Sequence, residues 1–168
     1  MSYVTLAQLA EIPGAVELAQ VASDDQRAPV TADLMALTLR AGDRSSYSAD
    51  AIAQADAAAA RIVSAIAQAD SLINGYLGRR YTLPLAKVHP MLATWSRAIT
   101  RYTLHGDRIS DERTDPIARD YRDALRFLEQ IAAGKFSLGL DDPTTGSGAL
   151  GDVLINPGHK VFGRDFLP

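Results

Sequence analysis

Residues 49–77 read ADAIAQADAAAARIVSAIAQADSLINGYL, and this stretch decides the fold of the chain. Nearly all of its residues favour the α-helix, and Ile52, Ile62 and Ile73 belong to an apolar series that follows one helix face. Ser48 is the expected N-cap of this helix. Because an α-helix rises about 1.5 Å per residue, the helix is about 40 Å long, which exceeds the diameter of a small domain. We therefore expect part of it to pack against something outside its own core.

The segment before this stretch contains signals for shorter helices. Thr5 opens a capping-box pattern, which predicts a helix that begins at once and ends before Pro13. A second short helix is predicted at residues 15–22. Thr31 is placed to cap a third helix, which is expected to end at Gly42. The N-terminal part of the chain is therefore expected to be helical, with a polar loop leading into the long helix.

Two further helices are predicted after the long one. Pro90 suits the first turn of a helix that ends at Gly106, because the N–H group that proline lacks has no partner in a first turn. Asp115 caps the last helix, Pro116 takes its first position, and Gly134 ends it. The last helix carries an apolar stripe at Ile117, Tyr121, Ala124, Leu128 and Ile131. The sequence predicts an all-α fold, a small helical bundle with one unusually long helix.

The chain is expected to divide near residue 140. Residues 1–140 are predicted to form one helical domain. Residues 141–168 contain glycine or proline every few positions and no helical period, so we expect an irregular, extended C-terminal tail. The tail still carries apolar side chains, Phe162 and Phe166 among them. Two alternatives remain open: the tail folds back over its own domain, or it becomes ordered against a partner subunit.

The composition argues against several classes of protein. The formal net charge of -3 does not suit a protein that coats nucleic acid, because that task needs a basic surface. The chain contains no cysteine, which excludes disulfides, thiolate catalysis and cysteine-ligated zinc, and we expect synthesis in the cytoplasm. The N-terminus lacks a signal-peptide pattern, and no segment approaches roughly 18 uninterrupted apolar residues. We expect neither classical secretion nor a membrane span.

No motif in the sequence points to catalysis. His89, His105 and His159 lie far apart and lack the spacing of a metal-binding motif. The sequence contains no G-x-S-x-G nucleophile motif and no glycine-rich loop placed to hold phosphate. We therefore expect no catalytic residue, no metal site and no cofactor, and an enzyme is the least favoured class.

A small helical DNA-binding regulator is the alternative from another class. Arg97 and Arg101 lie one turn apart on the helix that begins at Pro90, as in a helix–turn–helix protein. A recognition helix, however, needs polar residues that contact base edges, and the same helix carries Trp95 and Ile99, which suit a core. DNA recognition is therefore the less favoured function.

Four motifs, taken in order, resemble a known family. They are INGYLGRRYTLPL at 73–85, VHPML at 88–92, AITRYTLHG at 98–106 and YRDALRFLEQIAAGKFSLGL at 121–140. Together they resemble the Mu-like phage and prophage virion proteins, whose layout is similar to that of the head-to-tail connector proteins of tailed phages. The resemblance runs over about residues 51–140. The chain departs from the pattern at about 21–50, where relatives are shorter, so we expect an insert there.

The resemblance implies a structural virion protein without enzyme activity. It implies an all-helical protomer that forms a ring of about a dozen copies below the portal of a DNA-filled head. The implied partners are other copies of the chain, the portal protein and the neighbouring neck and tail proteins, and the implied location is the virion neck. Packaged DNA would pass through the ring without specific binding, and the net acidity suits a channel that does not grip phosphate. No contact with a membrane is implied.

A ring also suggests where subunits touch. Neighbouring subunits of a ring make heterologous contacts, and arginine and aromatic residues are favoured at such contacts. Tyr76, Arg79, Arg80 and Tyr81 would place these groups at the end of the long helix. The alternative is that the two tyrosines only close the end of the bundle while the arginines are solvated. The other predicted interface residues are Arg97, Arg101, Phe162 and Phe166.

Overall fold

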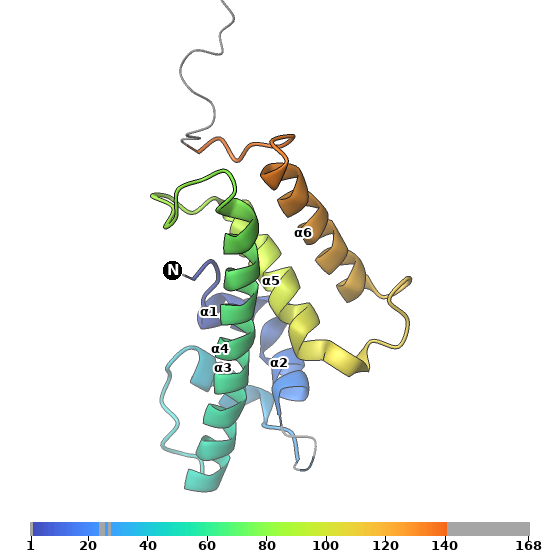
Figure 1. The fold of residues 1–168 in the computed structure, drawn as a ribbon. Helices are drawn as coiled ribbons and strands as arrows, with labels where there is room; N and C mark the ends of the chain where they lie inside the picture. The colour runs from blue at the N-terminus through green and yellow to red at the C-terminus, as the bar shows by residue number, and fades with distance from the viewer. Residues whose placement is uncertain (1, 24–25, 27, 141–168) are drawn as a thin grey trace, which may run out of the picture.

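The computed structural model describes residues 2–23, 26 and 28–140, and the regular structure of this part of the chain is helical (Figure 1). The α-helices are α1 (Leu6–Leu9), α2 (Ala15–Ala22), α3 (Ala32–Leu39), α4 (Ala49–Leu77), α5 (Pro90–His105) and α6 (Pro116–Ala132). The described residues contain no β-strand, and none of their helices is long and apolar enough to cross a bilayer. The predicted all-α bundle with one long helix is confirmed. The predicted tail at 141–168 lies outside the described residues.

Several helices begin at the caps predicted from the sequence. The N–H group of Thr5 donates to Oε1 of Gln8 at 2.9 Å, and the N–H group of Gln8 donates to Oγ1 of Thr5 at 3.2 Å, which completes a capping box. Oγ of Ser48 accepts a hydrogen bond from the N–H group of Ala51 at the start of α4. Thr31 precedes α3 without a side-chain hydrogen bond to that helix. Local sequence therefore determines most helix starts directly.

The chain bends sharply between α1 and α2. Ile12 has an extended backbone (φ -139°, ψ 116°), and the Ile12–Pro13 peptide bond is cis. Gly14 follows with a φ of 108°, which favours glycine because a β-carbon would be strained there. The predicted break before Pro13 is confirmed, and it leaves the Ile12 side chain on the surface.

Helix α4 contributes buried residues to two hydrophobic cores. Its first half contributes Ala55, Ala58 and Ile62 to a core shared with α1, α2 and α3. Its second half contributes Ala69 and Ile73 to a core shared with α5 and α6. Large, fully buried side chains around α4 are Leu9, Leu18, Leu34, Met35, Leu92, Leu128 and Ile131. Because α4 contributes to both cores, it is longer than a helix that packs on a single core.

The opposite face of α4 is exposed. Val63 is 50% exposed on this face, and its neighbours are mostly small. The exposed small residues that recur at spacings of 4 and 3 are Ala53, Ala57, Ala60, Ser64, Ala67 and Ser71. If α4 packs against something outside its own cores, as the sequence predicts, this exposed face is the one that would make the contact.

The predicted insert at 21–50 contains α3 and contributes to the first core. Leu34, Met35 and Leu39 of α3 are buried. Helix α3 ends at Leu39, slightly before the predicted end at Gly42. In the loop that follows, Arg44 pairs with Asp56 of α4, which ties the insert to the long helix.

A buried carboxylate joins the N-terminus to α4 and α5. Asp70 of α4 is 8% exposed, and its Oδ1 accepts hydrogen bonds from the N–H group of Tyr3 and from Oγ of Ser96, each at 3.2 Å. The Tyr3 hydroxyl donates to Oδ1 of Asn74 at 2.5 Å. Burial, and then the nearby Asp70 charge, raise the pKa of Tyr3. A carboxylate can be buried here because donors from two other segments meet it.

We expect Asp115→Ala to lower the free energy of unfolding by about 1 kcal/mol, because one helix cap is lost. Oδ1 of Asp115 accepts from the N–H groups of Ile117 at 2.7 Å and Ala118 at 3.3 Å, at the start of α6. Asp115→Asn is the matched control, because asparagine keeps a capping oxygen and should preserve stability. Urea unfolding followed by circular dichroism measures both variants. An alanine variant as stable as the original chain would contradict this role of the cap.

Candidate functional site

The residues predicted to form an interface lie in separate parts of the structure. Residues 76–81 surround the end of α4, whereas Arg97 and Arg101 lie along α5. Phe162 and Phe166 lie outside the described residues. The described candidates therefore form a turn at one end of the bundle and a helix face further along it.

At the end of α4, the two tyrosines pack against the second core. Tyr81 is 3% exposed and belongs to that core, and Tyr76 is half-buried against it. Arg79 is exposed, whereas Arg80 is half-buried. The buried ring of Tyr81 does not suit a surface contact, because its own chain covers it. Whether Tyr76, Arg79 and Arg80 contact another subunit stays a prediction.

Arg80 and Tyr81 hold the residues that follow α6. Nη1 of Arg80 donates to the carbonyl oxygen of Phe136 at 3.0 Å. The hydroxyl oxygen of Tyr81 accepts from the N–H group of Leu138 at 3.1 Å, and the Arg80 guanidinium lies 5.8 Å from the centre of the Tyr81 ring. The arginine and tyrosine at this turn therefore have a structural role inside the chain, since they fix the segment that closes the bundle.

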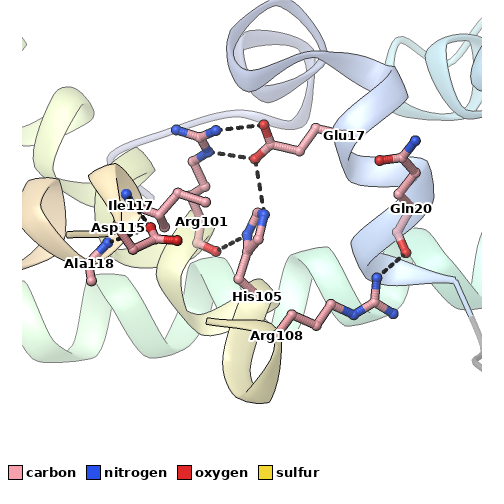
Figure 2. A network of polar contacts seen from close by, with 8 residues as sticks. All are labelled: Glu17, Gln20, Arg101, His105, Arg108, Asp115, Ile117 and Ala118. Atoms are coloured by element: carbon pink, nitrogen blue, oxygen red, sulfur yellow. Dashed lines mark hydrogen bonds and ion pairs between the residues drawn. The ribbon is translucent and has the colours of Figure 1, made fainter. Parts of the chain in front are cut away.

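Arg101 is bound within the chain by Glu17 of α2 (Figure 2). Nε of Arg101 donates to Oε1 of Glu17 at 2.5 Å, and Nη2 donates to Oε2 at 2.7 Å, so the pair is bidentate. Nε2 of His105 lies 3.6 Å from Oε1 of Glu17, and Arg108 donates to the carbonyl oxygen of Gln20 at 2.8 Å. The hydrogen bond to Glu17 raises the pKa of Arg101. This network links α2 to α5 and engages one of the two arginines of α5 that were predicted at the interface.

Arg97 has a different environment, one turn before Arg101. It lines a groove of about 520 Å³ between the bend at Ile12, α5 and α6. Nε of Arg97 is buried and has no hydrogen-bond partner among the described residues. The walls of the groove include Ile12, Trp95, Ala98, Asp123 and Phe127. This groove combines exposed apolar side chains with an unpaired guanidinium nitrogen, and it is the described surface best suited to binding.

The described residues contain no group of three or more histidine, cysteine, aspartate or glutamate side chains that could hold a metal ion. Two of the three histidines have structural contacts there. Nδ1 of His89 accepts from the N–H group of Met91 at the start of α5, and Nδ1 of His105 lies 2.8 Å from the carbonyl oxygen of Arg101. His159 lies outside the described residues.

Comparison with known proteins places the chain among phage proteins. The family described as "Bacteriophage Mu, Gp36" matches residues 3–153. The chain belongs to this family. It is 39% identical over 106 residues to "Mu-like prophage FluMu protein gp36" of Haemophilus influenzae, a match that covers 63% of this chain and 72% of the relative. It is 34% identical over 101 residues to "Gene product J" of Escherichia phage Mu, a match that covers 60% of this chain and 69% of the relative.

Sequence reasoning missed several residues that shape the groove of this Gp36-family protein. Glu17 lies 84 positions from Arg101, and no local pattern pairs residues at such a separation. A signal for Ile12 was present, because the Ile-Pro-Gly sequence predicts a helix break and places an aliphatic side chain at the bend. Phe127 gave a second signal, since it lies off the apolar stripe of α6.

We expect Tyr81→Phe to destabilise this Gp36-family protein by about 1–3 kcal/mol, because the buried N–H group of Leu138 would lose its acceptor. Arg79→Ala is the control at the same turn, because Arg79 is exposed and its removal should change stability by less than about 0.5 kcal/mol. Urea unfolding of the purified chain measures both variants. Equal stability of the two variants would show that the Tyr81 hydroxyl does not hold the segment after α6.

Proposed function

We propose that this chain is a non-enzymatic structural protein of a Mu-like phage or prophage, a subunit of a head-to-tail connector ring below the portal. The observation that carries the proposal is membership of the phage Mu Gp36 family, combined with an all-helical protomer built on one long helix. The sequence resemblance adds a likeness to head-to-tail connector proteins, in which the protomer contributes architecture rather than chemistry. The proposed location is the virion neck, and the proposed partners are other copies, the portal protein and adjacent neck and tail proteins.

The exposed face of α4 supports a contact between copies. Its small residues, from Ala53 to Ser71, recur at spacings that keep them on one side of the helix. Small side chains allow another helix to approach closely, and the half-exposed Val63 adds apolar area beside them. In a ring, this face would contact a different surface of the next copy.

The charge distribution favours a connector over a DNA-binding regulator. The formal net charge of -3 suits a channel through which DNA slides without a strong grip on its phosphates. Arg101 is held by Glu17 and so cannot turn freely toward a phosphate or a base. Trp95 and Ile99 of the same helix are buried, which does not suit a recognition helix.

Removal of the gene from its phage tests the proposal directly. We expect DNA-filled heads and separate tails, because a connector joins the two parts, and electron microscopy of the lysate would reveal them. Quantitative mass spectrometry of intact virions should find about a dozen copies of the chain per particle. Normal tailed particles without the gene would contradict the proposal. Sequence-specific binding of duplex DNA in a gel-shift titration would instead favour the regulator.

A substitution on the outer face of α4 tests the proposed contact. We expect Ala60→Arg to weaken assembly, because a long charged side chain would separate the packed surfaces. The stability of the protomer should change by less than about 0.5 kcal/mol, because Ala60 is exposed. Ala7→Arg, an equal change at an exposed position of α1, is the control. Light scattering and thermal unfolding measure the two effects, and unimpaired assembly of the Ala60 variant would exclude this face from the contact.

A further inference from the structure

The groove between the bend at Ile12, α5 and α6 has exposed apolar side chains and a buried hydrogen-bond donor without an acceptor among the described residues. Ile12 and Phe127 both line the groove, and their exposed fractions are 57% and 37%. Large apolar side chains gathered at one surface mark a site of interaction. Nε of Arg97 is buried without a hydrogen-bond acceptor from residues 2–23, 26 and 28–140, and such buried donors are rare in folded proteins. A molecule that fits the groove would therefore supply apolar side chains and a hydrogen-bond acceptor for Arg97.

Two acidic residues of α6 give the α6 wall of the groove a negative charge. Asp120 and Asp123 both line the groove. Asp120 makes a long contact of 3.4 Å with its exposed neighbour Arg119, and the charge of Asp120 also contributes to the raised pKa of Arg101. Asp123 is exposed. A matching occupant would carry cationic groups for this wall and a carboxylate for Arg97.

One segment of this chain has that combination. Residues 160–166 read KVFGRDF, with two aromatic side chains, Phe162 and Phe166. The same seven residues contain two cations, Lys160 and Arg164, and one carboxylate, Asp165. The preceding residues 141–159 contain no phenylalanine, lysine or arginine. Among the residues beyond the described part, the chemistry of the groove is matched by 160–166.

We infer that residues 160–166 of a neighbouring copy bind in this groove. Phe162 and Phe166 lie against Ile12 and Phe127, while Asp165 accepts from Arg97. Lys160 and Arg164 face the carboxylates of α6. This contact deepens the proposed function and rests on it, because a segment and a groove are the two different surfaces that a heterologous ring contact needs.

The course of the chain after α6 favours a neighbouring copy over the chain's own segment. Beyond α6 the chain crosses to the end of α4, where Arg80 and Tyr81 bind the backbone of Phe136 and Leu138 (Figure 1). This path leads away from the groove, which lies along α5 and α6. The residues between Leu140 and Lys160 can span up to about 65 Å when extended, so they can reach the next subunit.

Cysteine cross-linking tests the contact without background, because the chain contains no cysteine. One chain carries Thr94→Cys at the groove, and a second carries Gly163→Cys between the two phenylalanines. The two variants are co-assembled, oxidised and analysed on non-reducing gels. Ser46→Cys, at an exposed position in the loop before α4, replaces Thr94→Cys in the control. We expect the Thr94–Gly163 pair to form a disulfide between chains at about ten times the yield of the control pair.

The remaining outcomes of the cross-linking experiment distinguish a failure of this contact from a failure of the proposed function. The mass of the unoxidised assembly is measured in parallel. Assemblies that form without the Thr94–Gly163 cross-link would overturn the contact and leave the proposed function standing, whereas no assembly at all would count against both. In a chain that carries both cysteines, a disulfide confined to that chain would show that its own segment fills the groove, and this would also overturn the inference.

Charge reversal provides an independent measurement on the same pair of chains. Arg97→Glu in the groove chain should lower the cross-linking yield about tenfold, because it would place a carboxylate opposite Asp165. Asp165→Arg in the other chain should restore the yield if the two residues meet. A yield that stays low in the double reversal, with both chains folded by circular dichroism, would overturn the assignment of Asp165 to Arg97.

Discussion

The sharing of α4 by two cores is the constraint on which the rest of the structure depends. Each core has helices of its own, α1 to α3 in one and α5 with α6 in the other, and both use α4 as a wall. Alanines on the inner face, such as Ala55 and Ala69, are fully buried. Their small side chains let the neighbouring helices approach α4 closely, so the alanine-rich sequence serves packing as well as helix formation.

Polar contacts between the two halves set how they lie against each other. The bidentate Glu17–Arg101 pair connects α2 directly to α5, and Asp70 collects donors from the N-terminus and from α5. Such contacts are directional, whereas apolar packing alone tolerates sliding. The bend at Ile12 positions α2 for the first of these pairs, and it also forms one wall of the groove. The groove is therefore a consequence of how the two halves are joined.

The two surfaces invoked for the ring differ in chemistry. The outer face of α4 carries mostly small side chains. The groove instead presents aromatic side chains, a buried guanidinium nitrogen and carboxylates. Family membership limits the chain to Mu-like phage proteins, and these surfaces suggest how such a protein can assemble. Arg97 and Arg101 illustrate the division, because Glu17 binds the Arg101 guanidinium, whereas Nε of Arg97 has no hydrogen-bond partner in the part of the chain that the structure describes.

The amino-acid sequence by itself determined the secondary structure and much of the core. Capping residues such as Ser48 and Asp115, and breakers such as Pro13, act on backbone groups within a few positions, so their effect can be predicted locally. The apolar stripe of α6 identified its buried face for the same reason. Only the tertiary structure decided which polar groups far apart in the sequence are partners. Glu17 meets Arg101 across 84 positions, and Tyr81 meets Leu138 across 57, because the packing of separate helices brings them together and no local spacing encodes such pairs.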